Sequence, residues 1–205
     1  SVLRTLDAFT SGIINASSIT TLTGSASDQA TVRGSSGISG LGNEAVTLTD
    51  TSINASALIN LDALTTGVVN AAAITTITGT FAEINAVYAA LANGTITGLG
   101  NEAITISGIL TVAQANTLAA QTTGVITATI SEGDMATLAG LNEIGNAYTV
   151  TVTDASVDAS ALNTLDSKTT VNIIASAVNT ITGTAADINT TVSYTHLTLP
   201  TIRWV

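Results

Sequence analysis

The stretch GLGNEAVTLTDTSINASALINLD, residues 40–62, contains one copy of each kind of element that recurs along the chain. A glycine-rich turn comes first, and the run after it alternates apolar with polar residues, which is the period of a half-buried strand. Asn54 then stands where a helix N-cap would stand. Leu58 and Leu61 lie three residues apart and would share one helix face. The stretch therefore predicts a turn, a strand and a short capped helix, in that order.

Parts of this stretch return at intervals. The hexapeptide GLGNEA occurs at 40–45 and 98–103, with a shorter GLNE at 140–143, and ASALxxLD occurs at 55–62 and 159–166. Leucines also occupy equivalent places, at Leu6, Leu61, Leu118 and Leu165. Repetition on this scale predicts an array in which each unit buries its face against its neighbours. We divide residues 1–191 into double units of about 55 residues, namely 1–54, 55–109, 110–158 and an incomplete 159–191.

Capping chemistry marks the predicted helix starts. Ser, Thr, Asp or Asn at an N-cap accepts from the first backbone amides, and an acidic or Gln side chain three residues later can return the bond. The predicted N-caps are Ser25, Asn54, Thr80, Thr111, Ser131, Asp158 and Thr184. We expect helices of two to three turns, with Thr-Thr-Gly at 65–67 and 122–124 ending two of them on a left-handed glycine.

Strand-like runs lie between the predicted helices. The longer runs are 45–49, 104–107 and 148–153, and the shorter ones are 13–14, 68–69, 125–126 and 173–174. One short strand and one short capped helix per 20–30 residues predicts an α/β repeat solenoid with parallel strands, stacked as in leucine-rich repeats. The competing fold is a mostly-β solenoid or sandwich, in which ASALNTLD would be loop.

The composition excludes several classes of protein. Only 9% of the 205 residues are charged and 3% are aromatic, there is no cysteine, and the net charge is −10. The absence of cysteine excludes disulfide scaffolds, thiolate zinc sites and iron–sulfur clusters. The acidic balance argues against nucleic-acid binding. Thr, Asn and Gly interrupt every apolar run before the 18 residues that a membrane-spanning helix needs, so we expect no membrane span.

No catalytic or cofactor-binding residue emerges from the sequence. The only histidine, His196, lies close to the C-terminus, which leaves no other base for a Ser-His-Asp triad. GLGNEA fits G-x-G-x-x-A, but it precedes a predicted strand, whereas a dinucleotide site needs a helix there. No pair of carboxylates stands out from the others as a pair for sugar cleavage. We therefore expect a protein that is not an enzyme.

The carboxylates have mainly structural explanations. Asp28, Glu83, Asp134 and Asp187 stand at capping positions, where negative charge favours a helix N-terminus. Other carboxylates recur with the repeat and could stack as calcium ligands, although no EF-hand or nonapeptide calcium motif is present. The calcium candidates are Asp50, Asp62, Asp154 and Asp166.

The threonines of the predicted strands form a second candidate surface. Thr47, Thr49, Thr105, Thr151 and Thr153 would point outward and could form a hydroxyl ladder that binds carbohydrate or ice. The alternative is the ordinary strand propensity of threonine on an exposed face. Asn15, Asn70 and Asn172 interrupt the regularity and favour that alternative.

The last 14 residues, VSYTHLTLPTIRWV at 192–205, match no earlier part of the chain. VSYTHLTLPT resembles a translated transposase-type sequencing adapter. This resemblance implies a fragment from environmental (metagenomic) sequencing, cut on both sides, and a non-native tail.

The repeats themselves also resemble known ones. TAADIN at 184–189 and ASALNTLD at 159–166 are similar to tandem repeats of very long secreted or cell-surface, adhesin-like proteins of marine bacteria, and to repeats of marine phage tail fibres. The resemblance implies a non-enzymatic structural or adhesive segment, extracellular or on the cell surface. Its partners would be neighbouring repeats of the same parent chain, surface carbohydrate or other cells. A virion fibre segment is the alternative, and a solenoid carbohydrate-active enzyme is the third hypothesis.

Overall fold

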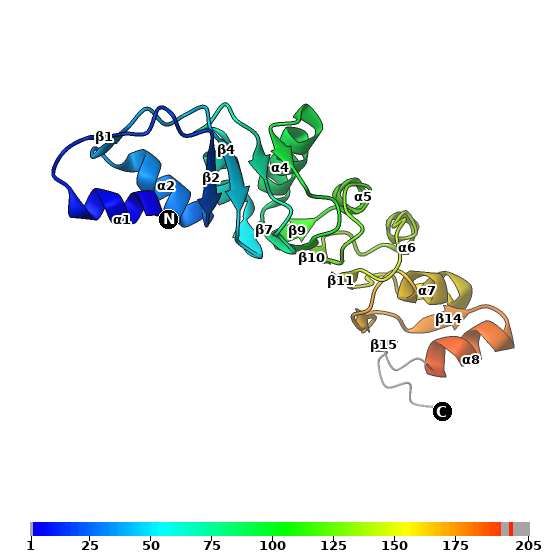
Figure 1. Ribbon diagram of the computed structural model, residues 1–205. Helices are drawn as coiled ribbons and strands as arrows, with labels where there is room; N and C mark the ends of the chain where they lie inside the picture. Colours follow the sequence, from blue (N-terminus) through cyan, green and yellow to red (C-terminus); the bar gives the residue numbers. More distant parts are fainter. Residues whose placement is uncertain (1, 194–196, 199–205) are drawn as a thin grey trace. The chain divides into compact units, whose positions relative to one another are not determined.

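The computed structural model describes residues 2–193 and 197–198 of the chain (Figure 1). The chain divides into two compact units, 1–102 and 103–205, and each is taken by itself. The elements of the first unit are α1 Val2–Phe9, β1 Ile14–Asn15, β2 Thr21–Gly24, α2 Ala26–Gly34, β3 Ile38–Ser39, β4 Ala45–Leu48, β5 Ser52–Asn54, α3 Ala55–Asp62, β6 Val69–Asn70, β7 Thr76–Gly79, α4 Phe81–Asn93 and β8 Ile96–Thr97. The elements of the second unit are β9 Ala103–Leu110, α5 Val112–Ala119, β10 Ile126–Ile130, α6 Met135–Leu138, β11 Ala147–Thr149, β12 Ser156–Asp158, α7 Ala159–Asp166, β13 Ile173–Ile174, β14 Thr180–Thr182, α8 Ala185–Ser193 and β15 Leu197–Thr198.

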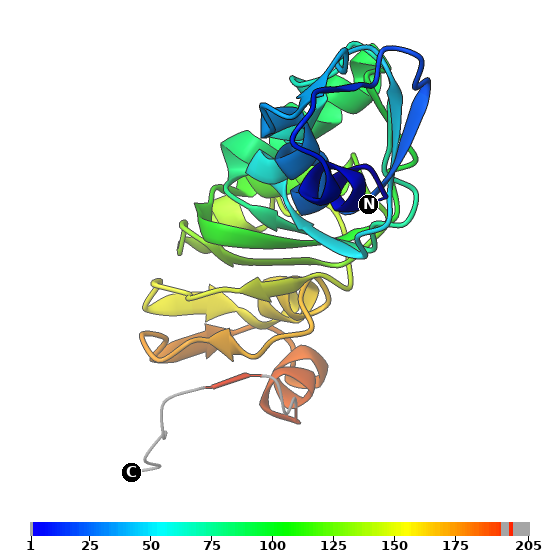
Figure 2. The same cartoon turned by 60° about the vertical axis from the view of Figure 1, so that its left-hand side comes forward.

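Every strand pair within a unit is parallel. The first unit holds the sheet β2-β4-β6-β8 and the pairs β1–β3 and β5–β7, and the second holds β9-β10-β11 and the pairs β12–β14 and β13–β15. A strand residue pairs with one about 24 positions further along, as Leu22 does with Val46 and Val157 with Ile181. Figure 2 shows the strands of the second unit one after another on one side and its helices on the other. The described residues thus form an α/β fold with eight helices, parallel sheets and no closed barrel.

The core is built from the apolar positions of strands and helices. Val46 and Leu48 are buried in β4, and Ile126, Ala128 and Ile130 are buried in β10, while the threonines that alternate with them face outward. The ASAL segments are the helices α3 and α7, whose paired leucines are buried. The mostly-β alternative is therefore wrong. At ASALNTLD the N-cap and the two buried leucines three residues apart stabilise a helix, where that alternative expected a loop.

Most of the predicted caps are confirmed. Thr80 with Glu83 and Thr111 with Gln114 form reciprocal capping boxes, and Ser25, Asn54 and Asp158 accept from the first backbone amides of their helices. The predicted cap at Ser131 is wrong. The Ser131 amide still donates to the carbonyl of Leu110, 2.8 Å away, as a continuation of the strand ladder, and Asp134 caps α6 instead.

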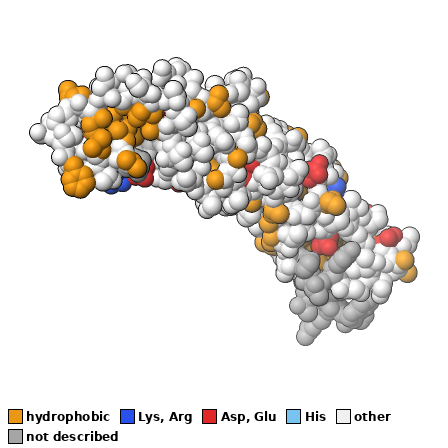
Figure 3. All heavy atoms as spheres, viewed as in Figure 1, with side chains coloured by type: hydrophobic (Ala, Val, Ile, Leu, Met, Phe, Trp, Pro, Cys, Tyr) orange, Lys and Arg blue, Asp and Glu red, His pale blue; other side chains and the backbone are white. Residues whose placement is uncertain are grey.

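The equivalence of Leu6 with the later leucines is also incomplete. Leu61, Leu118 and Leu165 are at most 2% exposed, whereas Leu6 is 49% exposed. Within α1, Leu3 is the residue that is buried in the first core cluster. Val2 and Phe9 are exposed beside Leu6, and Figure 3 shows hydrophobic side chains gathered in this part of the first unit.

The Thr-Thr-Gly prediction is wrong in its geometry. Gly67 and Gly124 do not have a positive φ, and the left-handed C-cap of the described helices is Gly94, at φ 79°. Gly67 is required for a different reason. A Cβ atom at this position would lie 2.4 Å from the carbonyl carbon and oxygen of Glu44, so the two backbones can pass only if no side chain is present.

Candidate functional site

The two GLGNEA turns place a glutamate side chain in the interior. In the first turn the Glu44 carboxylate accepts from the backbone amides of Gly42 and Asn43, at 2.7 and 3.1 Å. In the second turn Glu102 accepts from Gly100 and Asn101 with nearly the same distances. Gly42 and Gly100 adopt φ of +135° and +130°, which lets their amides point inward. GLGNEA is therefore a turn that feeds a strand, as predicted.

Each inward glutamate meets a polar side chain from a helix. Arg33 forms an ion pair with Glu44, and Tyr88 donates a hydrogen bond to Glu102. Arg33 and Tyr88 are both the eighth residue after their N-caps, Ser25 and Thr80. Burial lowers the pKa of Arg33, and the charge of Glu44 acts in the opposite direction. The same place in the repeat thus accepts either an ion pair or a neutral donor.

A threonine from the following repeat closes this turn. Thr65 Oγ1 donates to the Glu44 carbonyl at 2.6 Å and accepts from the Gly67 amide at 3.0 Å. Thr169 makes the same pair of bonds, to the Tyr148 carbonyl at 2.7 Å and from the Val171 amide at 3.1 Å. These bonds show that the counterpart of Glu44 in the second unit is Tyr148. Glu143, in the shorter GLNE sequence at 140–143, therefore does not take the place that Glu44 has.

Carboxylates also cap helices that precede them in the sequence. Asp50 accepts from the Ala26 amide and Asp154 from the Met135 amide, each at 2.7 Å, and Glu132 accepts from Val112. Each acceptor lies 19 to 24 residues after the amide that it caps, so it joins one repeat to the next. The sequence named Asp50 and Asp154 as calcium candidates, and no local signal revealed this capping role.

The four calcium candidates lie in different surroundings. Asp50 and Asp154 stand at the N-termini of α2 and α6, whereas Asp62 and Asp166 are the last residues of α3 and α7. Asp62 accepts from the Thr95 hydroxyl at 2.9 Å. Within residues 2–193 and 197–198, no three His, Cys, Asp or Glu side chains gather where they could hold a metal ion.

The threonine surface is outward, as predicted, but mixed. Thr49, Thr105, Thr151 and Thr153 are exposed and Thr47 is half-buried. In the four-stranded sheet one row across the strands reads Thr23, Thr47, Asn70 and Thr97. In the second unit Thr105 and Thr127 align with Ala147, and Thr151 bridges to Ile174. Amide and methyl groups thus interrupt the row of hydroxyls. This row of side chains is uncharged, but it is not a regular hydroxyl ladder.

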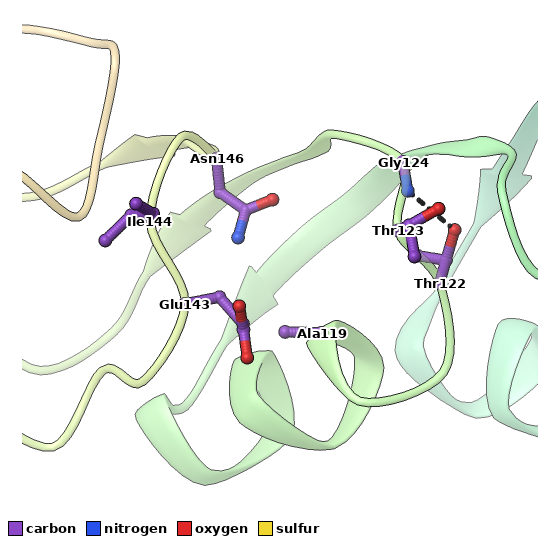
Figure 4. A pocket seen from close by; sticks show the side chains of 7 residues that line it. All are labelled: Ala119, Thr122, Thr123, Gly124, Glu143, Ile144 and Asn146. Atoms are coloured by element: carbon purple, nitrogen blue, oxygen red, sulfur yellow. Dashed lines mark hydrogen bonds between the residues drawn. The ribbon is translucent and has the colours of Figure 1, made fainter.

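A small polar pocket lies in the second unit (Figure 4). Its volume is about 70 Å³, and its lining residues are Ala119, Thr122, Thr123, Gly124, Glu143, Ile144 and Asn146. The Gly124 amide donates to Thr122 Oγ1 at 3.0 Å, which fixes the Thr-Thr-Gly side of the pocket. Burial, together with the charge of Glu143, raises the pKa of the neighbouring Tyr148 to about 12. No signal in the sequence pointed to this pocket, because its residues come from the end of α5 and from two separate segments, 122–124 and 143–146.

The predicted tail is described only in part. His196 lies outside the described residues. Leu197 and Thr198 pair in parallel with Ile173 and Ile174, as β8 pairs with β6. In the described part of the chain, the longest apolar helical stretch is too short to cross a bilayer.

Comparison of the chain with protein-family models, curated proteins and solved structures finds no match.

Proposed function

We propose that the chain is a segment of an α/β solenoid, and that it serves as a non-enzymatic structural and adhesive array in a large extracellular or cell-surface protein. The observation that carries this proposal is the recurring bond between repeats. Strands pair in parallel with counterparts about 24 residues later, and carboxylates such as Asp50 and Asp154 cap the helix of the preceding repeat. Stacked repeats of this kind form extended supports in which each contacts only its neighbours.

The use of the carboxylates supports a structural role over an enzymatic one. Five carboxylates accept hydrogen bonds from backbone amides, namely those of Glu44, Asp50, Glu102, Glu132 and Asp154. An acid or base in hydrolysis must exchange protons with a substrate, and a carboxylate held by backbone donors is poorly placed for that work. The uncharged threonine face and the small pocket of the second unit remain as surfaces for adhesion to carbohydrate or cells.

Small-angle X-ray scattering of the full chain tests the solenoid. We expect an elongated particle with a constant cross-section. A compact sphere would contradict the proposal, and a trimer would favour the phage-fibre alternative.

Incubation with a panel of polysaccharides tests the non-enzymatic role, with release of reducing ends as the readout. We expect no turnover. Turnover that a single Asp→Asn change abolishes would replace this proposal with a solenoid hydrolase.

A further inference from the structure

We propose that the pocket between Glu143 and Asn146 binds neighbouring hydroxyl groups at the edge of a sugar ring. The inference deepens the adhesive part of the proposed function, because it assigns that role to one site and one ligand chemistry. It rests on the donors and acceptors that face the pocket and on the size of the pocket.

Asn146 supplies a donor that has no acceptor among the described residues. The residue is 6% exposed, and its Oδ1 accepts from the Ile126 amide at 2.8 Å. This bond fixes the orientation of the side-chain amide, because a backbone N–H must meet the oxygen and not the nitrogen. The Nδ2 group has no hydrogen-bond partner in the described part of the chain, and Figure 4 shows it turned toward Glu143. A nearly buried amide with two unused N–H bonds points to a ligand.

Glu143 supplies an acceptor on the opposite side. Its carboxylate makes no hydrogen bond or ion pair with the described residues, whereas Glu44 and Glu102 are held by backbone amides. A group between Glu143 and Asn146 must donate to one and accept from the other. A hydroxyl does both, while the N–H bonds of Asn146 disfavour a cation and the charge of Glu143 disfavours an anion.

The size of the pocket favours one edge of a larger ligand. Its volume of about 70 Å³ is well below the roughly 300–1,000 Å³ of pockets that enclose a small molecule. Ile144 also lines the pocket, and Figure 4 shows its side chain turned away from Glu143 and Asn146. A pyranose ring carries neighbouring hydroxyls along its edge, and so matches the acceptor of Glu143 and the donor of Asn146 together.

Titration of the isotope-labelled full chain by NMR tests the site, with methyl α-glucoside, methyl β-galactoside and methyl α-mannoside as probes. We expect at least one glycoside to shift the Asn146 side-chain amide signals and the backbone amide signal of Ile144, with saturation in the millimolar range. Glu143→Gln should weaken that binding about tenfold, because a hydrogen bond to a charged acceptor is replaced by one to a neutral acceptor.

Two further variants keep the test independent of folding. Asn146→Asp retains an acceptor for the Ile126 amide but removes the N–H donor, so it should abolish the shift of the Ile144 backbone amide signal. Ile109→Ala removes a comparably exposed residue of the second unit, 65% against 69% for Ile144, and should leave binding unchanged. Each variant is used only if its far-ultraviolet circular dichroism matches that of the parent chain.

Two results would overturn the inference. One is the absence of a saturable shift with all three glycosides, and the other is equal binding by the parent chain, Glu143→Gln and Asn146→Asp. Neither result bears on the solenoid, which the scattering experiment tests separately.

Discussion

Single residues show how one place in a repeat tolerates different chemistry. Glu44 faces the buried guanidinium of Arg33, and Glu102 faces the hydroxyl of Tyr88 at the equivalent place. Two backbone amides hold each carboxylate in both turns, so the third partner is free to vary. The two turns thus share an inward carboxylate bound by two backbone amides, and they differ in the helix residue that contacts it.

Gly67 offers a test of the close approach between repeats. Gly67→Ala should destabilise the fold by about 1–3 kcal/mol, because the new Cβ would lie 2.4 Å from the Glu44 carbonyl group and the two backbones would have to separate. Gly34→Ala is the matched control, since no atom outside the adjoining backbone of its own helix lies within 4 Å of its Cβ position, and the helix prefers alanine. Urea unfolding followed by circular dichroism measures both. Equal midpoints for the two variants would contradict the role given to Gly67.

Asp158 offers a test of pH dependence at an N-cap. Hydrogen bonds from the Ser160 hydroxyl and from the amides of Ala161 and Ser160 lower the pKa of Asp158. A carboxyl with a lowered pKa in the folded state stabilises the fold above its ordinary value near 4, and this stabilisation is lost as the pH falls through the folded-state value. Asp158→Asn, the residue found at the equivalent Asn54, should reduce the loss of stability between pH 5 and pH 2. Urea midpoints across this range give the comparison, and an unchanged slope would count against the cap.

At the scale of elements, helix starts depend on groups outside the helix. The four-residue helix α6 has Asp134 as its cap and receives a second acceptor from Asp154, in the next repeat. A helix this short is not stable by itself in water, so these acceptors and the burial of Leu138 decide whether it forms.

Asp154→Ala should therefore loosen α6 by about 0.5–2 kcal/mol, the usual worth of a cap. Hydrogen exchange should speed up at the amides of Met135–Leu138 and stay unchanged in α7. Thr151→Ala is the control, since Thr151 is exposed, lies three residues before Asp154, and has a side chain that makes no hydrogen bond with the described residues. Faster exchange in both variants would show a general loosening rather than a lost cap.

The elements also show how far the sequence leads. Local signals were sufficient for the strands at 45–49 and 104–107 and for the helices that begin after Thr80 and Thr111, because alternation and capping act within a few residues. Contacts between repeats could not be predicted from the sequence. The start of α6 depends on the hydrogen bond between Ser131 and Leu110. The role of Gly67 depends on the nearby backbone of Glu44. The pocket depends on the turn at 122–124 lying beside Glu143 and Asn146. Each of these joins residues about 20 positions apart that no local pattern links.

At the scale of the whole molecule, the fold consists mainly of contacts between neighbouring repeats. The paired strands and cross-repeat caps link residues 19 to 27 positions apart. In the solenoid proposed above, stability would be close to a sum of unit and interface contributions, and cooperativity along the chain would be limited. We therefore expect the full chain to unfold over a broad temperature range, with a van't Hoff enthalpy below the calorimetric enthalpy.

Two matched core substitutions test whether a local loss of stability stays near the substituted residue. Leu61 and Leu118 occupy equivalent places in the two units and are 2% and 0% exposed. Replacing either with alanine should cost about 2–5 kcal/mol, because a cavity forms in a closed core. In a linear array Leu61→Ala should speed hydrogen exchange in α3 and its neighbours and leave α7 protected, while Leu6→Ala, at a half-exposed equivalent, should change little. If Leu61→Ala speeds exchange equally in every helix and the two enthalpies agree, the chain unfolds as one cooperative body and the array description fails.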